Sequence, residues 1–205
     1  MITLENYIGD FYGSYPQWIH STPWQITDNL LESLPKIILG LSGDYIFEGQ
    51  IAVHKTAVIG KGASINGPAV IGAFCSIGPN SVLREGVLLG NAVKIGPSCE
   101  IKASILGHDT AIAHLNYIGN SILGCHINFE AGSIAANHYN ERVNKTIFVV
   151  QGSETIHTGT EKFGALIGDH SKIGANAVLS PGTLLGMNSI VGRLQLVDQQ
   201  ANTSP

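Results

Sequence analysis

The sequence predicts an all-β chain that winds into a β-helix built from hexapeptide repeats. An aliphatic residue occupies every sixth position from Val53 to Ile101, and the same period returns from Ile167 to Val197. Glycine directly follows five of the nine members of the first series. A period of six fits neither an α-helix, at 3.6 residues, nor a two-faced strand, at two. It fits a chain that extends briefly, turns and repeats, with one aliphatic side chain pointing inward on each side of the coil.

These repeats resemble the left-handed parallel β-helix of the hexapeptide-repeat acyltransferase superfamily. In that fold three hexads form one triangular coil, so residues 18 apart lie in neighbouring coils, at a strand spacing of about 4.8 Å. Residues 53–101 then give nearly three coils and residues 167–197 roughly two more. Between them the interval slips to five residues at Leu106 and again at Leu123, and a shortened corner can explain such a slip.

The first 45 residues carry no hexads and predict a short, partly helical N-terminal cap. Within it, Asp28–Leu34 is expected to form a short helix that Pro35 ends. Such a segment is expected to cover the open first coil, whose unpaired backbone groups need a partner. The β-helix domain itself is expected to span residues 46–197.

Residues 139–163 leave the hexad pattern and predict an inserted hairpin. Thr146–Val150 and Thr155–His157 have the composition of two strands joined by a glycine-containing turn. The polar end of the chain, from Leu194 onward, is expected to fray, with residues 198–205 as a tail.

The composition predicts one soluble domain in the reducing cytoplasm. The chain has 205 residues, 25 of them glycine, and a formal net charge of −4, which argues against nucleic-acid binding through phosphates. No apolar run approaches the roughly 18 residues of a membrane span. No Lys or Arg precedes Lys36, so no secretory signal is expected. Cys75, Cys99 and Cys125 lack CxxC spacing and are expected to be small fillers rather than redox or metal groups.

Two cations are expected to share one ledge of the coil. Arg84 and Lys102 are 18 residues apart, which is one coil in this fold. Side by side they repel unless an anion lies near both, so they are either two solvated charges or a clamp for a phosphate group. Glu100 lies two residues before Lys102 and could neutralise it, or accept a hydrogen bond from an amine or a histidine.

A histidine and two asparagines follow on the next coils. His114 is either a structural hydrogen-bonding residue or a general base, since an imidazole titrates near neutral pH and can take a proton from an attacking amine or hydroxyl. The side-chain amides of Asn128 and Asn137 can hold sugar hydroxyls or a carbonyl oxygen.

Four motifs at matched intervals resemble a more specific family. The four motifs are Arg84, Glu100–Lys102, His114–Gly119 and Ile127–Asn137. Their sequences and spacing are similar to those in the acetyltransferase half of the bifunctional glucosamine-1-phosphate N-acetyltransferase / N-acetylglucosamine-1-phosphate uridylyltransferase. Thr158–Ala165, after the expected hairpin, is similar to the archaeal-type branch of these sugar-phosphate nucleotidyltransferases.

The resemblance implies transfer of an acetyl group from acetyl-CoA to the amine of a hexosamine 1-phosphate, in nucleotide-sugar biosynthesis. It implies His114 as the general base, with Glu100 and Asn137 as further catalytic groups. The backbone near Ala131 would line the acetyl-CoA slot, and no metal is expected at this site.

The resemblance also implies how the sugar phosphate is bound. Arg84, Lys102 and Lys162 would hold the phosphate, and Tyr117 and Asn128 would contact the sugar. Because the family is trimeric, a homotrimer with sites in the grooves between chains is implied. Neither a nucleic acid nor a membrane is expected as a partner.

The sequence departs from the family in three places. No Gly-rich nucleotide loop precedes the repeat, so uridylyl transfer is not expected. Glu130 stands where the family usually has glycine, and His138 follows Asn137 where tyrosine is usual. A carboxylate beside the acyl slot could disfavour anionic coenzyme A. The alternative is therefore a non-catalytic trimer that binds a sugar phosphate or a nucleotide sugar.

A third alternative is a metal hydrase like the γ-carbonic anhydrases, which also use left-handed β-helices. His114, His126 and His138 fall twelve residues apart and could suggest a zinc ligand set. Twelve residues are two sides of a triangle rather than a full coil, so these imidazoles are expected to point to different flanks. The ligand spacing of that family is also absent.

Overall fold

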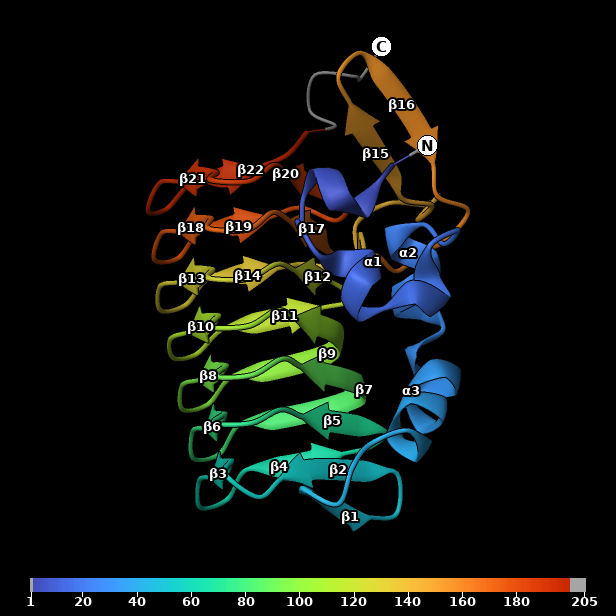
Figure 1. The fold of residues 1–205 in the computed structure, drawn as a ribbon. Helices are drawn as coiled ribbons and strands as arrows, with labels where there is room; N and C mark the ends of the chain where they lie inside the picture. Colours follow the sequence, from blue (N-terminus) through green and yellow to red (C-terminus); the bar gives the residue numbers. More distant parts are fainter. Residues whose placement is uncertain (1, 200–205) are drawn as a thin grey trace.

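The computed structural model describes residues 2–199, which form the predicted left-handed parallel β-helix with coils stacked along one axis (Figure 1). The coil has three flat sides, and most strands pair in parallel with the strands one coil above and below. We call the turn from the first to the second side the first corner. The second corner joins the second and third sides, and the third corner leads back to the first side.

Each coil places strands on the three sides in turn. The first side holds β2 (Ile51–His54), β5 (Ala69–Ile71), β12 (Ile122–Leu123), β17 (Ala165–Ile167) and β20 (Thr183–Leu185). The second side holds β3 (Val58–Ile59), β6 (Ser76–Ile77), β8 (Lys94–Ile95), β10 (Ala111–Ile112), β13 (Asn128–Phe129), β18 (Lys172–Ile173) and β21 (Ile190–Val191). The third side holds β4 (Ser64–Asn66), β7 (Val82–Leu89), β9 (Glu100–Leu106), β11 (Tyr117–Gly119), β14 (Ile134–Ala135), β19 (Val178–Leu179) and β22 (Leu196–Val197). Strands β7 and β9 continue round the third corner onto the first side.

The aliphatic members of the hexads fill the interior of the coil. Ile71, Leu89, Leu106, Leu123 and Ile167 stack in one column on the first side and are at most 1% exposed. Replacing such a side chain by alanine typically costs about 2–5 kcal/mol, because the rigid coil cannot collapse onto the cavity.

The slip in the hexad period is a shortened third corner. In β7, Glu85 and Gly86 turn this corner, whereas in β9 the single residue Ala103 does so, between the pairs Arg84–Lys102 and Val87–Ser104. Gly86 is required here, because its φ is +95° and an added Cβ would lie 2.8 Å from the Cβ of Leu30.

The N-terminal segment lies along the first side, and the expectation that it caps the open first coil is wrong. Its elements are η1 (Leu4–Asn6), α1 (Phe11–Ser14), η2 (Pro16–Trp18), α2 (Pro23–Asp28) and α3 (Leu30–Leu39). Figure 1 shows them beside the stacked coils rather than below them. They bury a second apolar cluster against the outer face of the first side, which includes Val70, Leu88 and Ile105. This face is apolar on its outside as well as its inside, so a lateral layer buries more apolar surface than an end cap would.

Helix α3 also runs through Pro35 instead of ending there. Leu34 and Ile38 flank the proline and are 0% and 9% exposed against the coil. An interior proline costs a helix about 3 kcal/mol, and burial of these two side chains offsets much of that cost.

At the open end, β1 (Tyr45–Glu48) pairs antiparallel with β2 and protects only the first side. The insertion forms the antiparallel hairpin β15 (Phe148–Gln151) and β16 (Glu154–His157), which projects at the opposite end (Figure 1). The expectation of fraying from Leu194 onward is wrong up to the last described residue. Strand β22 pairs with β19, and the Gln199 amide bonds both backbone groups of Leu184 at 2.8 Å. Residues 200–205 of the expected tail lie outside the described residues.

The three cysteines are free. Cys75 and Cys99 are 1% exposed, and each thiol donates to a backbone carbonyl at 3.0 Å, that of Gly90 or Ala113. Cys125 is only half-buried. Among residues 2–199, no helix has the length and apolar character of a membrane span.

Candidate functional site

The third corner gathers most of the charged side chains expected at the site. Arg84 and Lys102 occupy the same register position at the ends of the third-side segments of β7 and β9. Lys102 is 8% exposed, and its Nζ lies 3.2 Å from Glu85 Oε2. Arg84 donates to Glu100 Oε1 through Nε at 2.8 Å and Nη2 at 2.6 Å, and it also bonds Glu85. Glu100 therefore neutralises Arg84, while Lys102 forms its ion pair with Glu85.

The pKa values reflect this ion network. Burial acts to raise the pKa of Glu85, but the hydrogen bond and charge of Lys102, with the charges of Arg84 and Lys162, outweigh it and leave that pKa lowered. Burial acts to lower the pKa of Arg84, but the hydrogen bond and charge of Glu100, together with the charges of Glu85 and Tyr117, outweigh it and leave that pKa raised. Three cations, those of Arg84, Lys102 and Lys162, thus lie near the two carboxylates of Glu85 and Glu100 at this corner.

Two asparagines and a tyrosine extend the cluster by two coils. Asn137 is 5% exposed and donates its Nδ2 hydrogen to Asn120 Oδ1 at 2.7 Å. Burial raises the pKa of Tyr117, as does the charge of Glu100, while a hydrogen bond with Asn137 opposes the rise. Tyr117 therefore stays a neutral phenol next to both the ion network and the amides. We call these residues and Lys162 the corner cluster: Arg84, Glu85, Glu100, Lys102, Tyr117, Asn120, Asn137 and Lys162.

The insertion and the N-terminal segment bring Lys162 to the same corner. The backbone of Phe163 donates to the Asn137 carbonyl at 3.0 Å, so the insertion returns where it left. The ring of Phe163 packs edge-on against Trp24 of α2, with centroids 5.8 Å apart. Asp28, at the end of α2, has its pKa raised by burial, against the opposing hydrogen bond of Thr160 and charge of Lys162. The N-terminal segment thereby holds the Lys162 loop in place.

His114 lies at the second corner, at the other end of the third side. It precedes Tyr117 by three residues, and Leu115 turns the corner between them with a φ of +59°. Its side chain is exposed, and its carbonyl accepts from the Gly132 backbone at 2.9 Å. Ala131 therefore lies one coil above His114 at the same corner. The outer face of the third side thus runs from His114, past Tyr117, to the cations of the corner cluster.

Asn128 lies apart from the corner cluster. It begins β13 on the second side, in register with Lys172. Both line a groove of about 320 Å³ that extends to Glu130 and Arg193. Within a single chain, Asn128 and the Arg84–Lys102 pair therefore face different sides.

Glu130 is bound to an arginine that lies 63 residues later in the chain. Its two carboxylate oxygens accept from Arg193 Nε at 2.8 Å and Nη2 at 2.9 Å, and one also accepts the Ala175 backbone hydrogen at 2.9 Å. The bond with Arg193 and then that with Ala175 lower the pKa of Glu130 to about 2. The unusual carboxylate at the expected acyl slot is thus held and neutralised by Arg193.

The three histidines of the hydrase alternative lie at three different corners. His126 is at the first corner, where its ring stacks on His170 at 4.9 Å. His138 follows Asn137 at the third corner, and its Nδ1 lies 3.4 Å from Asn137 Oδ1. No group of three or more His, Cys, Asp or Glu side chains suited to a metal ion occurs in residues 2–199.

The structure adds site residues that the sequence did not single out. Glu85 could have been found from its position next to Arg84, and Asn120 from its place 17 residues, one shortened coil, before Asn137. The contribution of Asp28 had no sequence signal, because it depends on the path of α2.

Comparison with known proteins places the chain among relatives. A family model described as the GMPPB C-terminal domain matches residues 47–147. A bifunctional sugar-1-phosphate nucleotidylyltransferase/acetyltransferase of Sulfurisphaera tokodaii is 35% identical over 170 residues, which are 80% of this chain and 42% of that protein. A bifunctional protein GlmU of Methanococcus vannielii is 33% identical over 189 residues, 86% of this chain and 43% of its own length. Over 80–86% of its length the chain is thus similar to GlmU-type proteins.

The family resemblance inferred from the four motifs is thus confirmed. The chain spans less than half the length of these GlmU-type relatives. Among solved structures, a mutant perosamine N-acetyltransferase of Caulobacter crescentus in complex with CoA and GDP-perosamine aligns with 68% of this chain and 52% of its own, at 15% identity and a TM-score of 0.41.

Proposed function

We propose that this chain is an acyltransferase that moves an acetyl group from acetyl-CoA to the amine of a hexosamine 1-phosphate. The observation that carries the proposal is the line of groups along the third side: two stacked cations at one end, Tyr117 between, and the exposed His114 at the other. In a 2-amino sugar 1-phosphate, the phosphate and the amine are on neighbouring ring carbons. A phosphate at the third corner therefore directs the ring and its amine along this face.

Arg84, Lys102 and Lys162 hold the phosphate in this proposal. Arginine offers a planar fork and lysine a point charge. Glu85 already forms an ion pair with Lys102, and this pair must break when the phosphate binds. It is the most exposed member of the ion network, with a side chain 47% exposed, and is the carboxylate most readily turned toward water.

Tyr117 and Asn137 position the sugar and the amine. The buried Asn120–Asn137 bond fixes the second amide, and Asn137 in turn bonds the Tyr117 hydroxyl. Side chains held in this way lose little conformational freedom when the ligand binds.

His114 acts as the general base. The amine nitrogen attacks the thioester carbonyl, the N–C bond forms and the C–S bond breaks. His114 takes the proton that the amine loses and returns one to the leaving thiolate of coenzyme A. Positioned proton transfer of this kind is worth roughly 10²–10⁴ in rate.

The second-side groove suits the coenzyme. It reaches from Asn128 toward the second corner, where Ala131 lies one coil above His114, and exposed Lys172 lines it. Since Arg193 is bound to Glu130, Lys172 is the cation that is free for coenzyme phosphates. We propose a homotrimer in which the second side of one copy lies against the third side of the next, which brings Asn128 to the sugar.

The test is incubation of the purified chain with acetyl-CoA and either glucosamine 1-phosphate or galactosamine 1-phosphate, with free thiol as the readout. Thiol release that requires both substrates supports the proposal, and sedimentation then reports whether the active species is a trimer. Thiol release that is independent of the amino sugar, or absent for both sugars, contradicts it.

A second candidate is a trimer that binds a sugar phosphate without catalysis. It is favoured by the exposed position of His114, whose imidazole has no hydrogen-bond partner within residues 2–199. Thermal stabilisation by the sugar phosphate with no thiol release would establish this function instead.

A further inference from the structure

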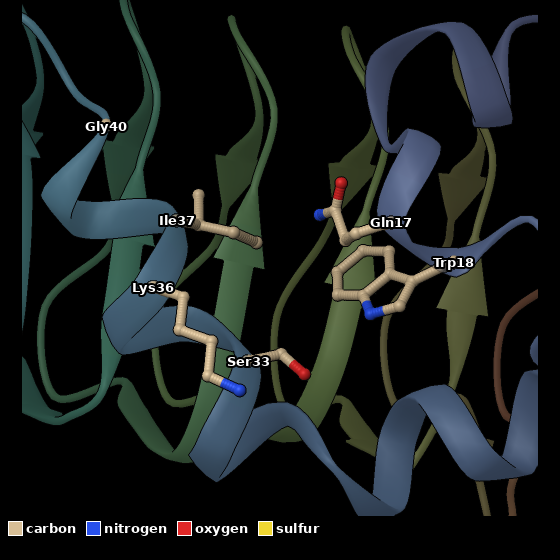
Figure 2. A pocket seen from close by; sticks show the side chains of 6 residues that line it. All are labelled: Gln17, Trp18, Ser33, Lys36, Ile37 and Gly40. Carbon is tan, nitrogen blue, oxygen red and sulfur yellow. The ribbon is translucent and has the colours of Figure 1, made fainter.

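A groove between the N-terminal segment and the coil contains chemistry that acetyl transfer does not use. It begins at a hollow of about 470 Å³ between η2 and α3, which Figure 2 shows from close by. It continues over the first side as a second hollow of about 330 Å³ that shares Gln17 and Ile37 with the first. Its inner end is a small cavity of about 80 Å³ that shares Ser14, Tyr15 and His108 with the second. The three hollows therefore adjoin one another through shared wall residues.

The outer end of the groove carries an unpaired cation. In Figure 2, Lys36 and Ser33 extend from α3 on one side of the hollow, and Gln17 and Trp18 lie opposite. Lys36 makes no ion pair within residues 2–199. An ammonium, a hydroxyl and an amide thus surround one opening, and all three can donate to an anion.

The middle of the groove is apolar. Ile37 and Leu41 form one wall, and Val70 and Leu88, on the outer face of the first side, form the floor. Such walls gain free energy by covering a hydrocarbon body.

The inner end presents a phenol that lacks a partner. The hydroxyl of Tyr15 makes no hydrogen bond within the described part of the chain, and this side chain lines two of the three hollows. Because no fully buried side-chain oxygen among these residues lacks a partner, this hydroxyl is open to the groove rather than enclosed. Burial, with the nearby Cys125 and Tyr45, raises its pKa to about 12, so it is a neutral donor at any physiological pH. Asp10 lines the same cavity, which disfavours an anion at this end.

We propose that this groove binds a small amphiphilic carboxylate or phosphate, with the anionic group at Lys36 and the hydrocarbon body over the first side toward Tyr15. The charges select this orientation, because the cation lies at the outer end and Asp10 at the inner end. The site is distinct from the corner cluster on the third side and does not depend on the proposed transferase activity.

The probes are octanoate, octan-1-ol and inorganic phosphate, titrated against the full chain with Trp18 fluorescence and thermal stability as readouts. Octanoate is expected to change the fluorescence and raise the melting temperature, and inorganic phosphate alone to do neither. Lys36→Met is expected to weaken octanoate roughly tenfold, which equals about 1.4 kcal/mol, and to leave octan-1-ol unchanged. Glu48→Gln, on the exposed strand β1, is the matched control and is expected to alter neither.

Two further variants separate the groove from a surface effect. Trp18→Phe is expected to remove the fluorescence change while keeping the thermal shift, which shows that binding persists. Ile37→Trp fills the junction of the two larger hollows and is expected to abolish binding of octanoate and octan-1-ol alike. Equal binding of octanoate to wild type and Lys36→Met, or no response of wild type to octanoate at millimolar concentration, would overturn the proposal.

Discussion

Glu85→Gln is expected to tighten the binding of a sugar 1-phosphate. Glu85 holds Lys102 at 3.2 Å and also bonds Arg84, so in the absence of ligand its carboxylate occupies the place proposed for the phosphate. Glutamine keeps the shape of the side chain and removes its charge. The variant therefore frees Lys102 and removes one repulsive charge next to the phosphate.

The size of the effect follows from the exposure of the pair. Two unit charges about 4 Å apart interact by about 1 kcal/mol in water and about 4 kcal/mol at an effective dielectric constant of 20. Because the Glu85 side chain is 47% exposed, the lower figure applies. It corresponds to a dissociation constant roughly fivefold smaller, and a smaller gain at high salt.

Calorimetric titration with glucosamine 1-phosphate at two salt concentrations measures this directly. Glu141→Gln is the matched control, because Glu141 is exposed in the insertion and belongs to no part of the corner cluster. Weaker binding by Glu85→Gln would refute the reasoning, since it would mean that the carboxylate holds the ligand's amine rather than competing with its phosphate.

Four other outcomes are expected. His114→Ala should lower the rate of thiol release by roughly 10²–10⁴-fold while circular dichroism shows an intact fold, whereas the control His126→Ala, at the first corner, should leave the rate near wild type. A near-wild-type rate for His114→Ala would exclude His114 as the base. Lys102→Met should raise the KM for the sugar phosphate and leave kcat nearly unchanged, and an equal fall in kcat would place Lys102 in transition-state stabilisation instead. Glu130→Gln should lower the melting temperature at pH 7 and have a much smaller effect near pH 2. A carboxyl whose pKa is lowered to about 2 contributes its full stability above its ordinary pKa and loses it as the pH falls through about 2, so an equal effect at both pH values would contradict the Arg193 bond as its cause. Leu106→Ala should cost about 2–5 kcal/mol in urea unfolding, against a small change for exposed Leu115→Ala, and equal costs would contradict burial as the source.

The sequence predicted the coil because its period depends on one local requirement, an inward aliphatic side chain on each side. The 18-residue interval likewise placed Arg84 and Lys102 in register. It did not predict which carboxylate each cation would take. Glu100 is closer in sequence to Lys102 but bonds Arg84 of the neighbouring coil, because all three side chains share one face and the spacing alone does not select the partner.

Contacts between residues on either side of the insertion could not be predicted from the hexad period. Glu130 and Arg193 meet only after the chain has passed through the hairpin and resumed its register. The lateral path of the N-terminal segment was missed for a related reason. Its apolar side chains indicate burial, but the partner surface is the outer face of the first side, whose apolar positions alternate with those that fill the interior.

The insertion leaves the coil after Asn137 and returns at Phe163, and these two residues bond each other's backbone. Strand β14 then pairs with β19, and β12 with β17, as though nothing intervened. The length of the hairpin is therefore uncoupled from the pitch of the solenoid. Extensions or a grafted peptide at the exposed tip of this arm, residues 152–154, can vary, provided that the buried Ile147 and Val149, the two anchoring residues and Lys162 keep their places.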